Sequence, residues 1–255
     1  MAERRLPGLE DPVNVVHGWD EAHRLSPAPR HRRRLVVDMV RRLGIADVLD
    51  AGCGQPYLLA ALKDELGIDA YGCDISDRTM EDTEGSPVAR EFRVLDLSKE
   101  VWPGRRFDIV ICSEVLEHIP DWPAAVANLD RMARRYVLIT VPTGKVRTMD
   151  RMVGHTQHFA GPELIAALGA AGCRPLEVRR WGFPLHSLYR ILISSQADRV
   201  YDAFSGEGGG GYGRMQRVVS EALYRAFFLN DPFRTGDELI VLARAPGAAA
   251  PEVVP

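Results

Sequence analysis

The 255-residue chain is short of cysteine, of net charge and of long apolar runs, and each shortage excludes a class of protein. Its four cysteines include no C-x-x-C pair, and three of them lie in or beside expected buried strands, where cysteine acts as a small apolar residue, so we expect a reduced, cytoplasmic protein without a disulfide framework. No window approaches the roughly 20 apolar residues of a membrane span, and the first residues lack a signal-peptide core. A net charge of -3 gives no bulk attraction to nucleic acid, so we expect no nucleic-acid partner.

The chain does contain one dense run of basic residues, "RHRRR", at residues 30–34. The apolar residues that follow recur at helical spacing, with Leu35, Val36, Met39 and Val40 on one face. We therefore interpret the run as the solvated face of an amphipathic helix, in preference to a phosphate-binding patch.

Apolar strands alternate with amphipathic helices from residue 45 to residue 181. This alternation predicts an α/β fold with a parallel sheet and helices on both faces. The expected strands cover residues 47–52, 70–76, 91–97, 107–113, 135–142, 174–181 and 238–245. Ligands of such sheets bind beyond the carboxyl ends of the strands, so the residues at those ends are the first candidates for a functional site.

The stretch "VLDAGCGQPYLLAAL", at residues 48–62, begins like a dinucleotide-binding turn and then departs from that pattern. Gly52 and Gly54 make a tight turn after an apolar strand, but "QPY" stands where the third glycine would be. Pro56 has no N–H group to offer to a phosphate. The turn therefore favours an adenosine with a small amino-acid tail over a dinucleotide.

Acidic residues follow the ends of four successive expected strands. Asp50 ends the first and Asp74 the second, 24 residues later, which is the spacing of a carboxylate that binds ribose hydroxyls. Asp96 ends the third strand, where it can accept a hydrogen bond from an adenine amino group while Leu97 packs on the ring. Glu114 follows the fourth strand. Packing alone does not require this repetition, so we expect these residues to line a nucleoside pocket.

Four motifs in order, "VLDAGCG", "GCDIS", "VLDL" and "FDIVICSEVLEHI", resemble those of class I S-adenosylmethionine-dependent methyltransferases with a type-11 domain. The resemblance covers about residues 35–180. It implies a Rossmann-like, mostly parallel sheet of seven strands with an antiparallel last strand, and S-adenosylmethionine as the cofactor. The cofactor-binding positions that it implies are Asp50, Ala51, Gly52, Cys53, Gly54, Tyr57, Asp74, Ile75, Asp96, Leu97, Ser113 and Glu114.

Methyl transfer requires an aligned nucleophile and, for a hydroxyl or an amine, removal of its proton. The candidate catalytic bases are His118 and the two histidines of "GHTQHF", His155 and His158. The "GHTQHF" stretch follows the fifth expected strand, where the chain passes over the predicted pocket. A structural role for these histidines is the alternative.

The "SEVLEHI" stretch also has a pattern that suits a metal. On a helix, Glu114, Glu117 and His118 would share one face, and His158 would complete a set of four ligands. This set is similar to the metal sites of ubiquinone-biosynthesis O-methyltransferases and of small-RNA 2′-O-methyltransferases, which implies a divalent cation that activates a hydroxyl. The stretch also resembles metal-free members, in which Glu117 and His118 brace the helix. We favour the metal-free interpretation and assign no metal.

The patterns divide the chain into five parts: an N-terminal lid segment (1–34), a cofactor-binding core (35–181), a helical insertion (182–237), a strand that completes the core (238–245) and a disordered tail (246–255). The insertion has helical patterns at residues 185–204 and 214–229, joined by "GEGGGGYG". It is either a pair of core-packing helices or a substrate cap. The apolar residues 224–233 add peripheral membrane contact and a homodimer as open alternatives.

We therefore predict an S-adenosylmethionine-dependent methyltransferase that acts on a hydroxyl or an amine of a small-molecule acceptor, such as a natural-product intermediate or a lipid-linked sugar. One alternative keeps the cofactor and changes the chemistry, to an intramolecular alkylation or a cyclisation. Two others are an NAD-dependent oxidoreductase and a non-catalytic nucleotide-binding protein. Asp50 before the glycines and the missing third glycine argue against NAD.

Overall fold

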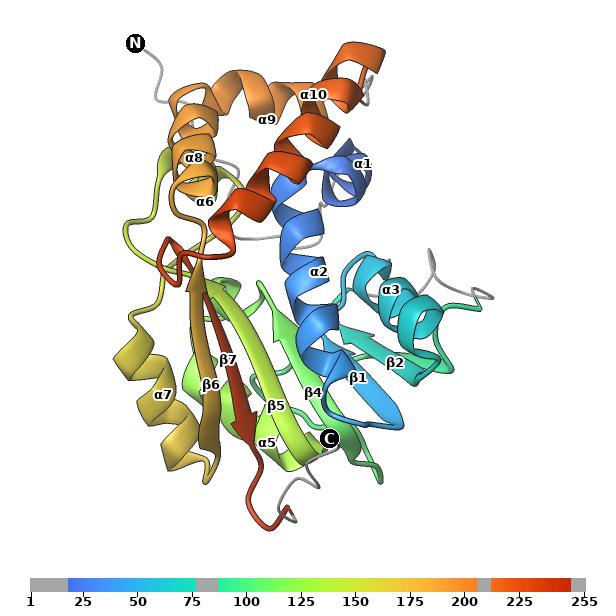
Figure 1. The fold of residues 1–255 in the computed structure, drawn as a ribbon. Coiled ribbons are helices and arrows are strands. Elements are labelled where there is room, and N and C mark those ends of the chain that lie inside the picture. Colours follow the sequence, from blue (N-terminus) through green and yellow to red (C-terminus); the bar gives the residue numbers. More distant parts are fainter. Residues whose placement is uncertain (1–17, 77–86, 206–211, 249–255) are drawn as a thin grey trace.

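The computed structural model describes residues 18–76, 87–205 and 212–248, and its centre is one seven-stranded sheet (Figure 1). The strands lie in the order β3-β2-β1-β4-β5-β7-β6. Among these strands, β7 runs antiparallel to both of its neighbours, which confirms the predicted fold class. The bounds are β1 Asp47–Ala51, β2 Asp69–Asp74, β3 Glu91–Val94, β4 Phe107–Ser113, β5 Ala133–Pro142, β6 Arg174–Trp181 and β7 Glu238–Arg244.

Helices cover both faces of the sheet because the strand residues alternate between two apolar clusters. Helices α2 (Pro27–Arg41) and α3 (Tyr57–Leu66) pack on one face, where they meet Ile109 and Ile111 of β4. Helices α5 (Trp122–Met132) and α7 (Gly161–Ala170) pack on the other, where they meet Val110 and Cys112. The switch point between β1 and β4 lies between these layers, where the strand order reverses.

The remaining helices gather beyond the carboxyl ends of the parallel strands (Figure 1). They are α1 (Gly18–Leu25), α6 (Thr148–Met152), α8 (Leu185–Ser195), α9 (Ala197–Ser205), α10 (Arg214–Ala226) and the 3-10 turn η2 (Phe227–Asn230). Helix α1 has no clear signal in the sequence, and the single helix predicted over residues 185–204 is two helices that break at Gln196. The predicted boundary between residues 34 and 35 falls inside α2. Residues 1–17, 206–211 and 249–255 of the predicted lid, glycine-rich stretch and tail lie outside the described residues.

The interpretation of residues 30–34 as a solvated face is wrong. His31 is 0% exposed, and its Nε2 lies 3.1 Å from Oδ1 of Asp231. Arg34 donates to Oδ2 of Asp231 at 2.7 Å. Asp231 belongs to the insertion, about 200 residues further along the chain, so the basic run faces the insertion and joins it to α2.

The third strand is shorter than predicted, because β3 ends at Val94. Asp96 and Leu97 therefore lie in the loop that follows it. All four cysteines are buried and free, as expected for a chain without a disulfide framework. None of the described helices is both long and apolar enough to cross a membrane.

Candidate functional site

The glycine turn after β1 is tied to the end of β2. The N–H groups of Gly52 and Cys53 both donate to the carbonyl of Cys73, at 2.8 and 2.9 Å. Gly52 has a φ of 79°, and a Cβ there would lie 2.5 Å from a methyl group of Val115, so the position requires glycine. Gly54 also has a positive φ, but no described atom lies within 4 Å of its Cβ position. The turn is therefore closed at Gly52 and open at Gly54.

Two carboxylates face this turn from the ends of β1 and β2. Asp74 accepts hydrogen bonds from the N–H groups of Gly54 and Ser76, at 2.8 and 3.0 Å. Asp50 is 3% exposed, and burial raises the pKa of Asp50 to about 7, with a further contribution from the charge of Asp74. A cation beside the pair would favour the ionised form of Asp50. This end of the sheet thus suits a ligand that carries a positive charge.

The two side chains predicted to hold an adenine, Asp96 and Leu97, differ in their exposure and contacts. Asp96 accepts from Nζ of Lys99 at 2.8 Å and from the hydroxyl of Ser98 at 2.6 Å, and these hydrogen bonds, that from Lys99 foremost, lower the pKa of Asp96. Leu97 is buried in the cluster beneath α5, whereas Ile75 is 55% exposed at the end of β2. Ile75 is therefore better placed than Leu97 to pack on a ligand.

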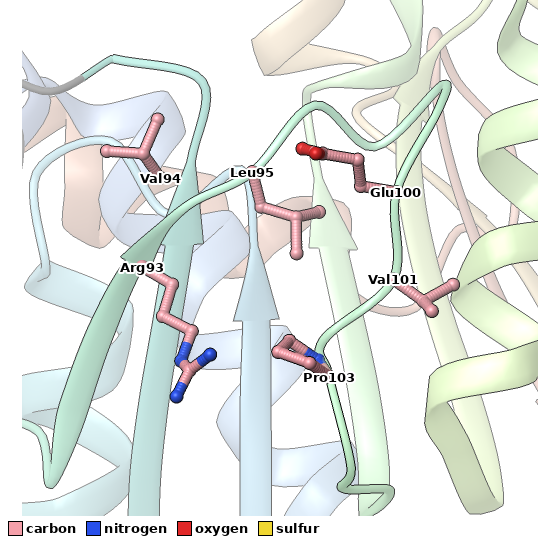
Figure 2. Close-up of a pocket in the computed structure, with 6 residues that line it drawn as sticks. All are labelled: Arg93, Val94, Leu95, Glu100, Val101 and Pro103. Carbon is pink, nitrogen blue, oxygen red and sulfur yellow. The ribbon is translucent and has the colours of Figure 1, made fainter.

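A cavity of about 410 Å³ lies beside the loop that leaves β3 (Figure 2). Its lining residues are Arg93, Val94, Leu95, Glu100, Val101 and Pro103. None of these residues is among the predicted cofactor-binding positions, but Glu100 accepts a hydrogen bond from the N–H of Asp96 at 3.2 Å, so the cavity borders the loop that carries Asp96 and Leu97.

The structure does not place Glu114, Glu117 and His118 on one helix face, so that prediction is wrong. Glu114 has a φ of 58°, in the left-handed region, which a right-handed helix does not accommodate. The only helical structure in this stretch is η1 (Leu116–His118), a single 3-10 turn. The left-handed residue therefore interrupts the helical spacing on which the prediction depends.

Glu114 is instead held from two sides at the end of β4. Thr140 donates to its Oε1 at 3.0 Å, and a guanidinium nitrogen of Arg32 lies 3.1 Å from its Oε2. The hydroxyl of Ser113 is bonded to that of Thr140 at 2.9 Å. The predicted positions Ser113 and Glu114 thus form a network that joins β4, β5 and α2.

Glu117, His118 and His155 meet next to this network, and their ligand atoms lie within 4.8 Å of one another. Glu117 is fully buried, and neither of its carboxylate oxygens has a hydrogen-bond partner. Nδ1 of His118 lies 3.1 Å from the carbonyl of Gly154. Because a carbonyl only accepts, Nδ1 carries the proton and Nε2 keeps its lone pair. We call these three side chains the Glu117 cluster; it contains His155 in place of the predicted Glu114 and His158.

The loop that carries His155 is fastened onto η1. The N–H and the hydroxyl of Thr156 both donate to the carbonyl of Glu117, at 3.0 and 2.9 Å. The side chain of Gln157 donates to the carbonyl of Ile119 at 3.1 Å. Buried Phe159 packs edge-on against Trp122. These contacts fix the position of the loop histidines relative to Glu117.

A second group of charged side chains connects His158 to the insertion. Nε2 of His158 lies 3.2 Å from Nδ1 of His155 and 3.5 Å from Oδ2 of Asp150. Asp150 is bonded to Arg190 of α8 at 2.8 Å, and Arg190 also contacts Asp237 at 3.3 Å. The predicted bases His155 and His158 therefore lie together, and α8 reaches the site through Arg190.

Burial sets the protonation of the three predicted bases. It lowers the pKa of His118 and of His158, and it lowers the pKa of His155 to about 2, with neighbouring positive charges adding to the effect on His155. All three imidazoles are therefore neutral near pH 7. Neutral imidazoles can accept a proton or bind a metal, but His155 is too weak a base to remove a proton efficiently.

Two arginines of α2 lie next to the predicted site residues. Neither was predicted as a site residue from the sequence, and the basic run at residues 30–34 was the one signal of their presence. Arg32 contacts Glu114, as described above. The guanidinium of Arg33 lies 5.7 Å from the ring centroid of Tyr57, at the start of α3. Burial and the charges of neighbouring arginines lower the pKa of Arg33. Within the described residues, Arg33 has no carboxylate within ion-pair distance.

Comparison with known proteins places the chain in a family. A family model described as a methyltransferase domain matches residues 20–178. The chain is 31% identical to the ubiquinone biosynthesis O-methyltransferase of Methylococcus capsulatus over 149 residues, 52% of this chain and 59% of that protein's length. It is 32% identical to the enzyme of the same name from Thiobacillus denitrificans over 179 residues, 61% of this chain and 76% of that protein.

Solved structures share the fold. The [4+2]-cyclase SpnF has a TM-score of 0.58 and 17% identity, with 84% of this chain and 80% of that chain covered. Magnesium protoporphyrin IX methyltransferase (ChlM) from Synechocystis PCC 6803 with bound SAH has a TM-score of 0.52 and 18% identity, with 89% and 93% covered. The family model covers more than half of the chain and confirms the cofactor that the motifs predicted. The chain belongs to the methyltransferase domain family and is a class I S-adenosylmethionine-dependent methyltransferase.

Proposed function

We propose that this enzyme methylates a hydroxyl group of a small molecule. The observation that supports the proposal best is the Glu117 cluster, where a buried carboxylate without hydrogen-bond donors lies beside two neutral imidazoles. Such a set suits activation of a hydroxyl more than binding of an amine that is already nucleophilic. Both relatives named above are O-methyltransferases, which agrees with an oxygen acceptor.

The cofactor-binding roles follow from the two strand ends. The ammonium of the methionine portion would lie near Asp50, since a cation there favours the ionised carboxylate. The open space at Gly54 fits the approach of that portion to the turn. Asp74 keeps lone pairs for the ribose hydroxyls beyond its two backbone hydrogen bonds, and Ile75 would pack on the adenine.

Arg33 is the residue that we assign to the cofactor carboxylate. Arg30, Arg32 and Arg34 each contact a carboxylate of the chain, whereas Arg33 faces Tyr57 at the end of the glycine turn. A partly buried guanidinium is stabilised by a carboxylate partner, and the methionine carboxylate would supply one there. Asp50 and Arg33 would then bind the two charged groups of the same amino-acid tail.

The Glu117 cluster also fits a divalent cation, which revises our preference for a metal-free site. Carboxylate oxygen and imidazole nitrogen are ordinary ligands for such ions, and the hydrogen bond of His118 to Gly154 orients its free nitrogen. A bound cation would lower the pKa of an acceptor hydroxyl, and S-adenosylmethionine supplies a methyl group that is already activated. His158 is the histidine paired with a carboxylate, Asp150, so we assign it the role of proton acceptor.

Titration calorimetry tests the cofactor assignment. Wild-type protein should bind S-adenosylhomocysteine but not NAD, and Asp74→Ala should lose this binding. Arg33→Met should weaken binding of S-adenosylhomocysteine but leave binding of 5′-methylthioadenosine unchanged, because the second ligand has no carboxylate. Equal loss of both ligands in Arg33→Met would contradict the role of Arg33.

Metal binding and turnover test the acceptor assignment. We expect Mn²⁺ or Zn²⁺ to bind to wild-type protein and to His23→Asn, which replaces an exposed histidine of α1, but not to Glu117→Gln or His155→Asn. Production of S-adenosylhomocysteine with a panel of phenols and diols should be retained in His23→Asn and lost in Glu117→Gln and His155→Asn. Methylation of amines alone, or full turnover after removal of all divalent cations, would show that the oxygen acceptor or the cation is misassigned.

A further inference from the structure

The insertion exposes an unusual amount of apolar side-chain surface. Of the fourteen large apolar side chains that are exposed in the described part of the chain, ten lie between Phe183 and Phe233. Single exposed apolar residues are ordinary, but a concentration of them in one segment marks an interaction surface.

Helix α10 exposes apolar side chains and buries a polar one, the reverse of a helix that packs on a core. Its inner side packs against α2 and buries Ser220, while Met215, Val218 and Val219 are exposed on the far side, at 75%, 60% and 49%. Their spacing of i, i+3 and i+4 places them on one face of the helix. The apolar face of α10 thus points away from the protein core.

Helix α8 exposes further apolar side chains in the same segment. Leu188, Ile191 and Leu192 are each about half exposed, on the side opposite to buried His186. Phe183, just before α8, contacts Phe233 after η2, with ring centroids 5.9 Å apart. Figure 1 shows α8 and α10 at the end of the molecule furthest from the sheet. We define the apolar face as Phe183, Leu188, Ile191, Leu192, Met215, Val218, Val219, Leu229 and Phe233.

The charges of α10 are mainly positive. Arg214, Arg217 and Arg225 lie on this helix, and its only acidic residue, Glu221, is paired with Arg30 and Arg225. Arg217 is paired with Glu21 of α1, and α9 carries Asp198 and Asp202 beside Arg199, so the excess of positive charge belongs to α10. A helix with an apolar strip bordered by arginines is typical of segments that lie in the interface of a bilayer. A second copy of the chain docked on the same face would bring like charges together across a two-fold axis. An anionic surface would complement them.

We propose that the apolar face binds the surface of a lipid bilayer that contains anionic headgroups. The apolar side chains of α8 and α10 enter the region between headgroups and acyl chains, and Arg214 and Arg225 contact the phosphates. Since no described helix can cross a bilayer, the attachment is peripheral. This inference does not depend on the acceptor or on the metal proposed above.

Flotation with lipid vesicles tests the proposal. The wild-type protein should float with vesicles of phosphatidylcholine and phosphatidylglycerol, more weakly with phosphatidylcholine alone, and less as the salt concentration rises. The double variant Leu192→Ser, Val218→Ser should bind at least about tenfold more weakly, because two apolar side chains are lost from the bilayer. Arg214→Gln with Arg225→Gln should remove the preference for the anionic lipid.

Val178→Ser is the matched control, because Val178 is 46% exposed on β6, outside the apolar face. It should float like the wild type, and all variants should bind S-adenosylhomocysteine normally, which shows that they are folded. Absence of flotation, or flotation that is equal in the apolar double variant, overturns the proposal. Light scattering adds one more decisive outcome: a wild-type dimer that the double variant abolishes would assign the face to a second copy of the chain.

Discussion

At the scale of single residues, Asp50 is a group whose charge we expect cofactor binding to change. It is buried at the end of β1 beside Asp74, and its pKa is raised to about 7. The S-adenosylhomocysteine ammonium would add a positive charge next to it and favour the carboxylate. Binding of the ligand should therefore be linked to release of a proton from Asp50.

This linkage predicts a pH dependence of cofactor binding. Below pH 7 the free enzyme must lose the proton on Asp50 before it binds well, so the affinity for S-adenosylhomocysteine should fall by up to about tenfold per pH unit between about pH 7 and pH 6. Above the raised pKa the affinity should level off. Calorimetry in buffers of different ionisation enthalpy measures the released proton directly. Asp50→Asn should remove the dependence and Asp96→Asn should retain it; an unchanged slope in Asp50→Asn would exclude Asp50 as the source.

At the scale of elements, the contact between α2 and the insertion is built around one buried phenylalanine. Phe227 of η2 is fully buried, and its ring contacts His31, His186 and Tyr189. Its neighbour Phe228 is 42% exposed. The same substitution at these two adjacent positions therefore compares the loss of a buried ring with the loss of a half-exposed ring.

We expect Phe227→Ala to lower the free energy of unfolding by about 3–5 kcal/mol, since a buried ring is removed and leaves a cavity. Phe228→Ala should cost only about 1 kcal/mol, because much of that side chain already contacts water. Urea denaturation of the two variants measures both values. Equal losses would mean that Phe227 does not anchor the insertion.

The sequence was sufficient to predict the seven strands and the place of Asp50, Asp74 and Glu114 at strand ends, because both depend on local patterns, although Asp96 lies in the loop beyond β3. Apolar periodicity marks a buried strand wherever its partners lie, and the glycine turn requires its residues locally. The same local reasoning failed at Glu114, where a left-handed residue interrupts an otherwise helical pattern. It also failed at residues 30–34, because their partners Glu221 and Asp231 are about 190–200 residues away and no local signal identifies them.

At the scale of the whole molecule, the insertion and the sheet share one apolar cluster. Leu35 of α2, Trp181 of β6 and Phe227 of η2 belong to the same cluster as the central strands. Arg34 and His31 add polar contacts to the insertion at the same place. Elements that share a core unfold together, so we expect the described insertion helices and the sheet to form one cooperative unit.

Two tryptophans report on this cooperativity from opposite faces of the sheet. Trp181 contacts His31 and His186 at the insertion, whereas Trp102 packs against Tyr71 and Phe107 on the α5 side. Variants in which Trp181 or Trp102 is the only one of the four tryptophans that remains should unfold in urea at midpoints that match by fluorescence and by far-ultraviolet circular dichroism of the same variant. S-Adenosylhomocysteine should raise both midpoints equally, because a ligand that binds only the folded state stabilises the whole cooperative unit. If the Trp181 signal changed at a lower urea concentration than the circular dichroism of the same variant, the insertion would open before the sheet unfolds, and the site would be exposed by a local transition rather than by global unfolding.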